Sequence, residues 1–164
     1  MNEDMKHYIL QQFIRLVSMV KQHIRHFLKN LMKLVRDLWT VNCSKRILSN
    51  LLRLLKEVAL ICRHDLHSHF SWLVPRFILL LETEAWELVP ITLETICAFG
   101  PSLQRHFHQI LPYITQMMLS RCMKGRERLQ MTILTALEDI SSSLSVPEMT
   151  GGVLVPLIQI LHQP

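Results

Sequence analysis

Apolar residues recur along most of the chain at spacings of three and four, which is the pattern of amphipathic α-helices. This pattern predicts helices over residues 7–39, with a break near Lys21, and over residues 45–63. Pro90 is expected to open a later helix and Gly100 to end it. The chain has 4 glycines and is 49% hydrophobic, which also favours helix over sheet. The sequence therefore predicts an all-α protein.

The sequence also contains a repeat that is much longer than the helical spacing. A glutamate precedes a proline by eighteen residues three times, at Glu57 and Pro75, Glu94 and Pro112, and Glu138 and Pro156. The steps between the prolines are 37 and 44 residues, which is the length of HEAT-type helical pairs. We expect a single HEAT-like α-solenoid of about four antiparallel helical pairs, covering approximately residues 7–41, 45–82, 88–122 and 128–164. Each proline should lie near the start of the second helix of its pair, where its missing N–H costs little.

The first segment fits the same repeat more loosely, with Met32 in the position of the prolines. This alignment puts five residues in the apolar positions of the repeat, namely Leu16, Met19, Phe27, Leu31 and Leu34. The sequence shows no polar helix that would cap either end of the stack, as a free solenoid needs. We therefore expect the chain to be a piece of a longer solenoid or the product of a truncated gene model.

Composition and charge argue against several classes of function. The formal net charge is +5, and the basic residues form no stripe with interleaved aromatics, so we expect no nucleic-acid binding. The longest apolar runs are too short for a membrane-spanning helix. The four cysteines form no CxxC pair, which favours reduced thiols and a cytoplasmic location.

The first 42 residues carry a more specific signal. The segment YILQQFIRLVSMVKQHIRHFL over residues 8–28, continued by KLVRDLW over 33–39 and by Asn42, closely resembles the middle HEAT region of the TOR kinase family. The resemblance extends along essentially the whole chain. It implies a serine/threonine kinase as the parent protein, with this segment in its scaffold and away from the kinase domain. No catalytic residue can be transferred to this chain.

The expected function follows from the resemblance and from the missing motifs. The glycines form no phosphate-binding loop, and no kinase catalytic loop or DFG triplet occurs, so we expect no enzymatic activity and no cofactor. The leading hypothesis is a non-catalytic scaffold segment that supports complex assembly in growth and nutrient signalling. The alternative is a free-standing HEAT-repeat adaptor of the transport or phosphatase scaffold type.

The resemblance also implies partners and a location. The implied partners are TOR-complex subunits such as Raptor and the rest of the TOR chain, with homodimerisation through the parent complex. The implied location is cytoplasmic and allows peripheral attachment to endomembranes through that complex.

Two groups of residues are candidates for binding. Polar residues that could ligate a metal gather at His64, Asp65, His67 and His69, with His106 and His108 in the matching place one repeat later. A solvated turn is the favoured interpretation, and a metal site or a pH-responsive contact are the alternatives. The candidate protein-partner contacts are an aromatic residue in an acidic connection and a basic group between repeats, namely Trp86, Arg121, Lys124, Arg126 and Arg128. For Trp86 the favoured interpretation is packing and partner contact is the alternative. For the basic group the favoured interpretation is a solvated loop between repeats, and docking of an acidic segment of a partner is the alternative.

Overall fold

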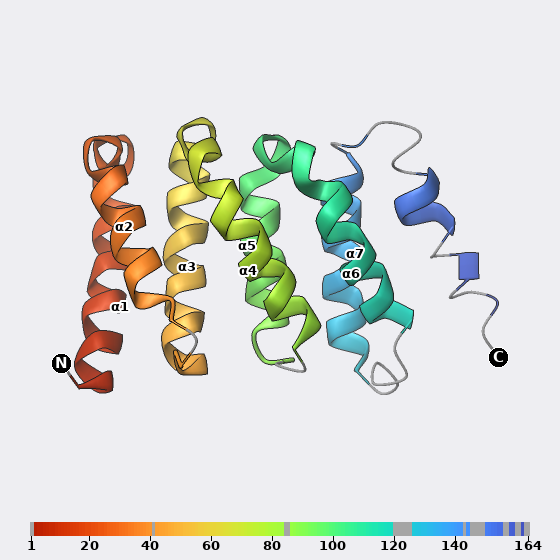
Figure 1. Ribbon diagram of the computed structural model, residues 1–164, viewed down its shortest axis with the longest axis horizontal. Helices are drawn as coiled ribbons and strands as arrows, with labels where there is room; N and C mark the ends of the chain where they lie inside the picture. The colour runs from red at the N-terminus through yellow and green to blue at the C-terminus, as the bar shows by residue number, and fades with distance from the viewer. Residues whose placement is uncertain are drawn as a thin grey trace.

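A computed structural model describes residues 2–40, 42–83, 86–119, 126–142, 144, 150–155, 158–159 and 162. Within these residues the chain is an all-α solenoid without strands, as predicted (Figure 1). The α-helices are α1 (Glu3–Val20), α2 (Leu28–Leu38), α3 (Lys45–Cys62), α4 (Phe70–Glu82), α5 (Val89–Phe99), α6 (Phe107–Leu119) and α7 (Glu127–Ser141). The 3₁₀ turns η1 (Lys21–Phe27), η2 (Arg63–His69) and η3 (Gly100–His106) join the helices of the first three pairs, and a short π-helix covers Thr150–Leu154.

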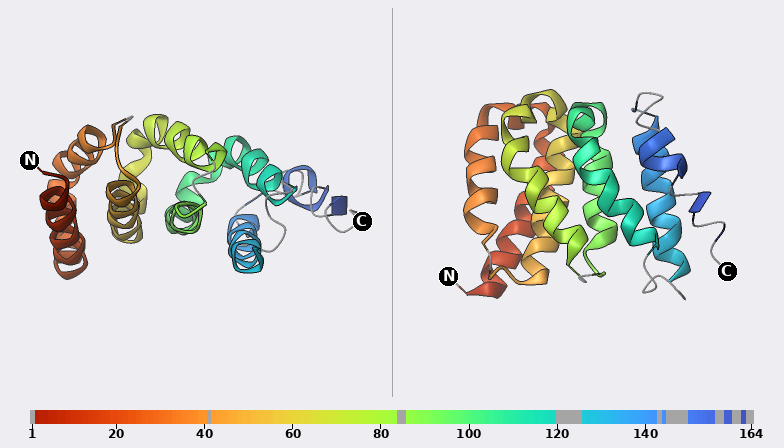
Figure 2. Two further views of the ribbon diagram at one scale, coloured as in Figure 1. Left: turned by 90° about the horizontal axis from the view of Figure 1, so that it is seen from below. Right: turned by 45° about the vertical axis from the view of Figure 1, so that its right-hand side comes forward.

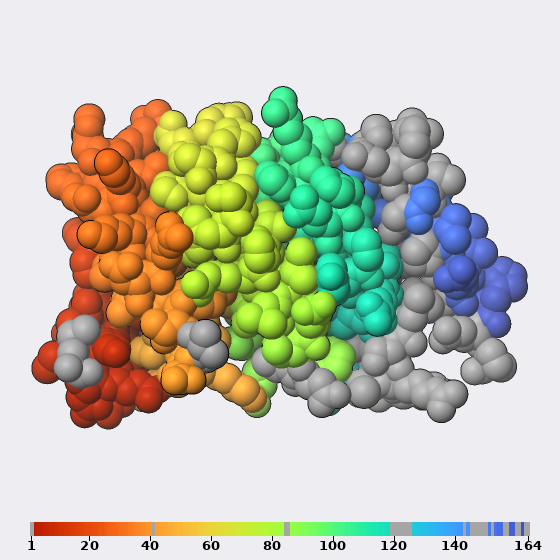
Figure 3. Space-filling model, viewed as in Figure 1, coloured from red at the N-terminus to blue at the C-terminus, as the bar shows by residue number. Residues whose placement is uncertain are grey.

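The helices form two layers that run the length of the stack. Helices α1, α3, α5 and α7 make one layer and α2, α4 and α6 make the other, as Figure 2 shows from below. Within a layer each helix packs mainly on its neighbours, α1 on α3, α3 on α5, α5 on α7 and α4 on α6. The α2, α4 and α6 layer forms most of the face shown in Figure 3. A continuous core lies between the layers and includes Leu51, Leu55, Phe70, Phe77 and Phe99.

The structure corrects the alignment of the first pair by one residue. Helix α2 begins at Leu28 where α4 begins at Phe70, so Lys33, not Met32, takes the position of Pro75. The residues one step from the expected apolar positions are the buried ones, such as Val17 and Leu28. The side chains of Leu16, Met19 and Phe27 are instead 49%, 79% and 62% exposed, and Leu34 is half-buried, whereas Leu31 is buried as expected.

The prolines lie deeper in their helices than expected. Pro75 is the sixth residue of α4 and Pro112 the sixth of α6, because these helices begin earlier than predicted, at Phe70 and Phe107, directly after the 3₁₀ turns. Each proline removes a hydrogen bond to the carbonyl four residues earlier, on Ser71 or His108. Both prolines and both carbonyl-bearing residues are exposed, so water can bond the freed carbonyls. Pro156 lies outside the described residues.

The helix ends follow the sequence signals more closely. The Ser44 hydroxyl caps α3 by accepting a hydrogen bond from the Ile47 amide at 3.4 Å. Pro90 lies in the first turn of α5, as expected. Gly100 ends α5 with a φ of 52°, in a region that favours glycine. Lys21, the first residue of η1, has a similar backbone conformation, with a φ of 46°.

Two of the three repeated glutamates, Glu57 and Glu94, bond to the neighbouring helix of the same layer. Glu57 of α3 accepts a hydrogen bond from the Ser18 hydroxyl of α1 at 3.3 Å. Glu94 of α5 forms an ion pair of 2.7 Å with Lys56 of α3. The repeat therefore reflects contacts between neighbouring pairs. None of the helices in the described part of the chain is both long and apolar enough to cross a membrane.

Candidate protein-contact site

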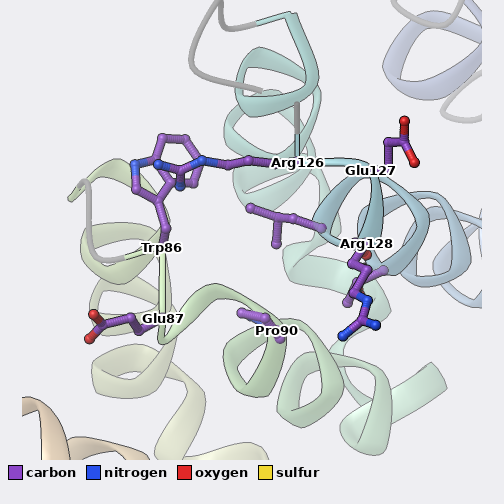
Figure 4. Close-up of a pocket in the computed structure, with 8 residues that line it drawn as sticks. Trp86, Glu87, Pro90, Arg126, Glu127 and Arg128 are labelled. Atoms are coloured by element: carbon purple, nitrogen blue, oxygen red, sulfur yellow. Dashed lines mark hydrogen bonds between the residues drawn. The ribbon is translucent and has the colours of Figure 1, made fainter. Parts of the chain in front are cut away.

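A hollow lined by both apolar and charged residues lies where the connection between α4 and α5 meets the start of α7. Its volume is about 570 Å³, and Trp86, Glu87 and Pro90 form one side (Figure 4). Arg126, Glu127, Arg128, Leu129 and Thr132 form the other side. The hollow is at the ends of the helices opposite to the η1, η2 and η3 turns.

A contact across the hollow joins two residues that the sequence analysis selected separately. The Arg126 guanidinium lies over the Trp86 ring, 4.8 Å from its centre (Figure 4). Such a cation–π contact contributes about 0.5–1 kcal/mol at an exposed site. Trp86 is half-buried against the core, and Arg126 is exposed. The ring therefore packs against the protein while it also forms a wall of the hollow, so packing and partner contact are compatible for this residue.

The charges around the hollow are mixed. Glu127 and Arg128 are exposed, and their side chains extend away from the Trp86 ring in Figure 4. Glu87 forms an ion pair of 3.5 Å with Lys45 of α3, and both side chains are largely exposed. Of the basic candidates, Arg126 and Arg128 line the same hollow, and Arg121 and Lys124 lie outside the described residues.

The residues that line the hollow are suited to holding a protein segment. They offer an indole ring, two guanidinium groups and two carboxylates, which can bind through stacking, ion pairs and hydrogen bonds. The other lining residues, Glu87, Pro90, Glu127, Leu129 and Thr132, were not predicted as contacts from the sequence. Their neighbours in sequence, Trp86 and Arg128, were the available signal. The spatial meeting of two segments forty residues apart could not be read from the sequence.

The histidines and the aspartate of the predicted cluster make separate contacts in the structure. Asp65 pairs with Arg25 of η1 at 3.3 Å, so this carboxylate faces the preceding turn. His67 and His106 each pack edge-on against Phe70, with ring centres 5.3 Å and 5.7 Å away. The Trp72 indole N–H donates to His69 Nδ1 at 3.4 Å. In the described part of the chain, no group of three or more histidine, cysteine or acidic side chains is arranged to hold a metal ion.

Two of these histidines have altered proton affinity. Burial, with a smaller contribution from Arg36, lowers the pKa of His69. Burial also lowers the pKa of His106, helped by the positive charges of His108, His67 and Arg105. Both groups therefore favour the neutral form in the folded protein. The pH-responsive interpretation thus has a physical basis at these two positions.

Comparison with known proteins places the chain among much longer ones. No protein-family model matches the sequence. The chain is 22% identical over 163 residues to the serine/threonine-protein kinase mTor of Drosophila melanogaster, a match that covers 98% of the chain and 6% of the kinase. It is 29% identical over 127 residues to the serine/threonine-protein kinase TOR of Arabidopsis thaliana, covering 71% of the chain and 5% of that kinase. The TOR kinase of Oryza sativa subsp. japonica is 27% identical over 142 residues, covering 79% of the chain and 6% of the kinase.

These matches confirm the resemblance that the first 42 residues indicated. They also set its extent, since the chain spans only about one twentieth of the length of the relatives it matches. The chain is therefore similar in sequence to a short segment of the TOR serine/threonine kinases.

Proposed function

We propose that the chain is a non-catalytic HEAT-repeat scaffold segment of a TOR-like serine/threonine kinase, and that it supports complex assembly in growth and nutrient signalling. One observation carries this proposal: an all-α solenoid matches TOR kinases over up to 98% of its length but only 5–6% of theirs. A stacked solenoid offers an extended surface whose shape is set by local contacts, which suits a scaffold. The sequence contains none of the phosphate-binding or catalytic motifs that a kinase needs.

The partners and the location belong to the same proposal. The partners would be subunits of the parent complex such as Raptor, the rest of the kinase chain, and a second protomer within that complex. The location would be the cytoplasm, with peripheral attachment to endomembranes through the complex. The resemblance to TOR kinases supports each of these assignments.

The hollow at Trp86 is the proposed contact for one of these protein partners. The indole ring is held by the core on one side and by the Arg126 guanidinium on the other, so it is fixed before a partner arrives. Rigid aromatic and arginine side chains are the residue types that dominate binding energy at protein interfaces. Arg128 and Glu127 add exposed charges at the edge of the hollow.

The main experiment asks which polypeptide contains this sequence in the cell. An antibody raised against the chain would be used for immunoprecipitation, followed by gel sizing and peptide mass spectrometry. The proposal predicts a polypeptide far larger than the 19.3 kDa of the chain, with kinase-domain peptides in the same band. A product near 19.3 kDa that purifies without kinase peptides would instead support a free-standing adaptor and refute the proposal.

A second experiment tests the hollow. Trp86→Ala combined with Arg126→Ala should reduce recovery of Raptor with the protein, because both changes remove the fixed aromatic wall. Arg105→Ala is the matched control, since Arg105 is exposed in η3 at the other end of the helices. Equal recovery with the double variant and the control would show that the hollow does not contact this partner.

A further inference from the structure

The junction between α2 and α4 holds an arginine side chain in a fixed position. The Arg76 guanidinium of α4 lies over the rings of Trp39 and Trp72, 5.5 Å and 5.7 Å from their centres. It also donates a hydrogen bond to the Trp39 backbone carbonyl. Trp39 is buried and Trp72 is half-buried, so the protein holds both rings in place. These three contacts fix the direction of the cation before any ligand arrives.

More positive charge faces the same junction. One face of α2 carries Lys29, Lys33 and Arg36, which recur at spacings of four and three and are all exposed. Burial lowers the pKa of Arg76, and the nearby positive charge of Arg36 lowers it further. The same two causes lower the pKa of His69, which directly precedes α4. Within the described ranges no carboxylate forms an ion pair with these lysines and arginines, so the junction carries surplus positive charge.

The repeat shows that the fold does not need these charges. When α2, α4 and α6 are aligned by their first residues, Ile78 takes the position of Arg36 at the junction between α4 and α6. Tyr113 takes the position of Arg76 at the same junction. Both are half-buried and uncharged, and α4 packs closely on α6. Two cations that raise each other's free energy at the first junction therefore have no structural role that an uncharged pair could not fill.

The chemistry of the junction suits carboxylates. A guanidinium has five N–H donors in a planar fork that matches a carboxylate, and the Trp39 carbonyl accepts from only one of the terminal nitrogens of Arg76. The basic face of α2 spans about 10 Å along the helix axis, at 1.5 Å per residue, so it can bind further carboxylates of the same segment. Tryptophan and arginine are also the residue types that dominate binding energy at protein interfaces.

The two indole rings argue against nucleic acid as the ligand. Proteins that bind single strands stack bases on open aromatic faces. Here Trp39 is buried, and the Arg76 guanidinium lies over the ring of Trp72, so these rings are poorly placed to stack on bases. A protein segment needs no such stacking.

We propose that the junction between α2 and α4 binds an acidic segment of a partner protein. One carboxylate of the segment pairs with Arg76, and others pair with Lys29, Lys33 and Arg36 along α2. The choice of a protein as the ligand rests on the proposed scaffold function. The site is separate from the hollow at Trp86, which lies at the connection between α4 and α5.

The test is fluorescence anisotropy with the polypeptide as cells express it and a fluorescein-labelled peptide. The peptide carries Glu at spacings of three and four with Leu and Ala between, and a second peptide has Gln in place of Glu. The Glu peptide should bind saturably and more weakly as salt is added, and the Gln peptide should not bind. Arg36→Gln should weaken binding roughly tenfold, as expected for a lost charge-assisted hydrogen bond. The matched control Arg53→Gln, at an exposed position of α3 in the other layer, should leave the affinity unchanged.

A second variant tests the fixed guanidinium. Arg76→Lys keeps the charge but loses the planar fork, so it should also weaken binding of the Glu peptide, with limited proteolysis as the control for folding. If this variant misfolds, Arg36→Gln decides, because Arg36 is exposed and its replacement leaves the core intact.

Three outcomes would overturn the inference. They are equal binding of the Glu and Gln peptides, an Arg36→Gln affinity equal to that of the control, and tighter Arg36-dependent binding of a single-stranded oligonucleotide or of phosphatidylserine vesicles. Kinase-domain peptides are scored separately by mass spectrometry of the purified polypeptide. Arg36-dependent binding of the Glu peptide to a polypeptide without a kinase domain would refute the proposed function and leave this inference intact.

Discussion

The two positive-φ positions of the turns offer a direct test of how the repeat is built. Lys21 and Gly100 occupy equivalent places after α1 and α5, with φ values of 46° and 52° and ψ values of −124° and −137°. A side chain with a Cβ is strained in this region, whereas glycine is not. We therefore predict that Lys21→Gly stabilises the protein and that Gly100→Ala destabilises it.

The magnitude follows from two opposing terms. Backbone strain at such a residue costs about 1–3 kcal/mol. Glycine loses more freedom on folding, which costs about 0.5–1 kcal/mol. Lys21 is exposed, so its removal should add little else, and the net gain is roughly 1 kcal/mol. Gly100→Ala should cost a similar amount, because a Cβ there would meet the Arg63 guanidinium at 3.6 Å, an ordinary contact that adds no clash.

Urea unfolding followed by circular dichroism measures both changes as shifts of the midpoint at constant slope. For a chain of this size, about 1 kcal/mol corresponds to a shift of roughly 2–4 °C in Tm. Gln22→Gly is the matched control, because Gln22 is the exposed neighbour of Lys21 and φ is not positive there. The control should destabilise slightly. If Lys21→Gly lowers stability as Gln22→Gly does, the strain argument is refuted.

Three further predictions concern the core, the histidines and a thiol. Leu111→Asp should abolish most of the helical signal in circular dichroism, because its cost in stability is at least the roughly 3–5 kcal/mol of a buried Leu→Ala change. Leu79→Asp, at an exposed position, should keep the helical signal. The pKa values of His69 and His106 are lower in the folded protein than the value of about 6.5 expected for an unfolded histidine, so the unfolded state binds more protons as the pH drops from that value. Tm should therefore fall as the pH drops from about 6.5, and it should fall less steeply in the variant with both histidines changed to Gln. Burial and the Asp139 and Glu94 carboxylates raise the pKa of Cys97 to about 12. Iodoacetamide near pH 8 should therefore modify this thiol far more slowly in the folded chain than in the urea-unfolded chain. Equal rates would show that the thiol is accessible.

The sequence predicted the solenoid well because helical spacing and a long repeat are both linear signals. Helix α3 was expected over residues 45–63 and is found over Lys45–Cys62. The register of the first pair was wrong for a physical reason. Helix α1 carries two apolar stripes, and hydrophobicity alone cannot tell the buried stripe with Val17, which meets α3, from the half-exposed stripe with Leu16. Only the packing of α1 on α3 separates them.

The candidate site could be predicted from the sequence less completely than the fold. Trp86 and Arg126 were each selectable by residue type, because an aromatic among acidic residues and a basic cluster stand out in the sequence. Their contact depends on how far α7 is displaced from α5 across the stack, and that displacement is set by packing of apolar residues such as Leu93 and Ala136. The sequence therefore supplied the residue types of the hollow but not their meeting.

Two of the three glutamates that mark the repeat make polar contacts between neighbouring pairs. Apolar packing along the stack tolerates many side chains, and the equivalent positions Leu55 and Thr92 differ in polarity while both stay buried. The contacts of Glu57 with Ser18 and of Glu94 with Lys56 are exposed, so each contributes at most about 1 kcal/mol to stability. Each contact instead favours one position along the helix axis at its own junction, and the two partners, Ser18 and Lys56, lie at different positions of the repeat. A regular solenoid needs that register more than it needs the energy, because an error at one junction would displace every pair beyond it.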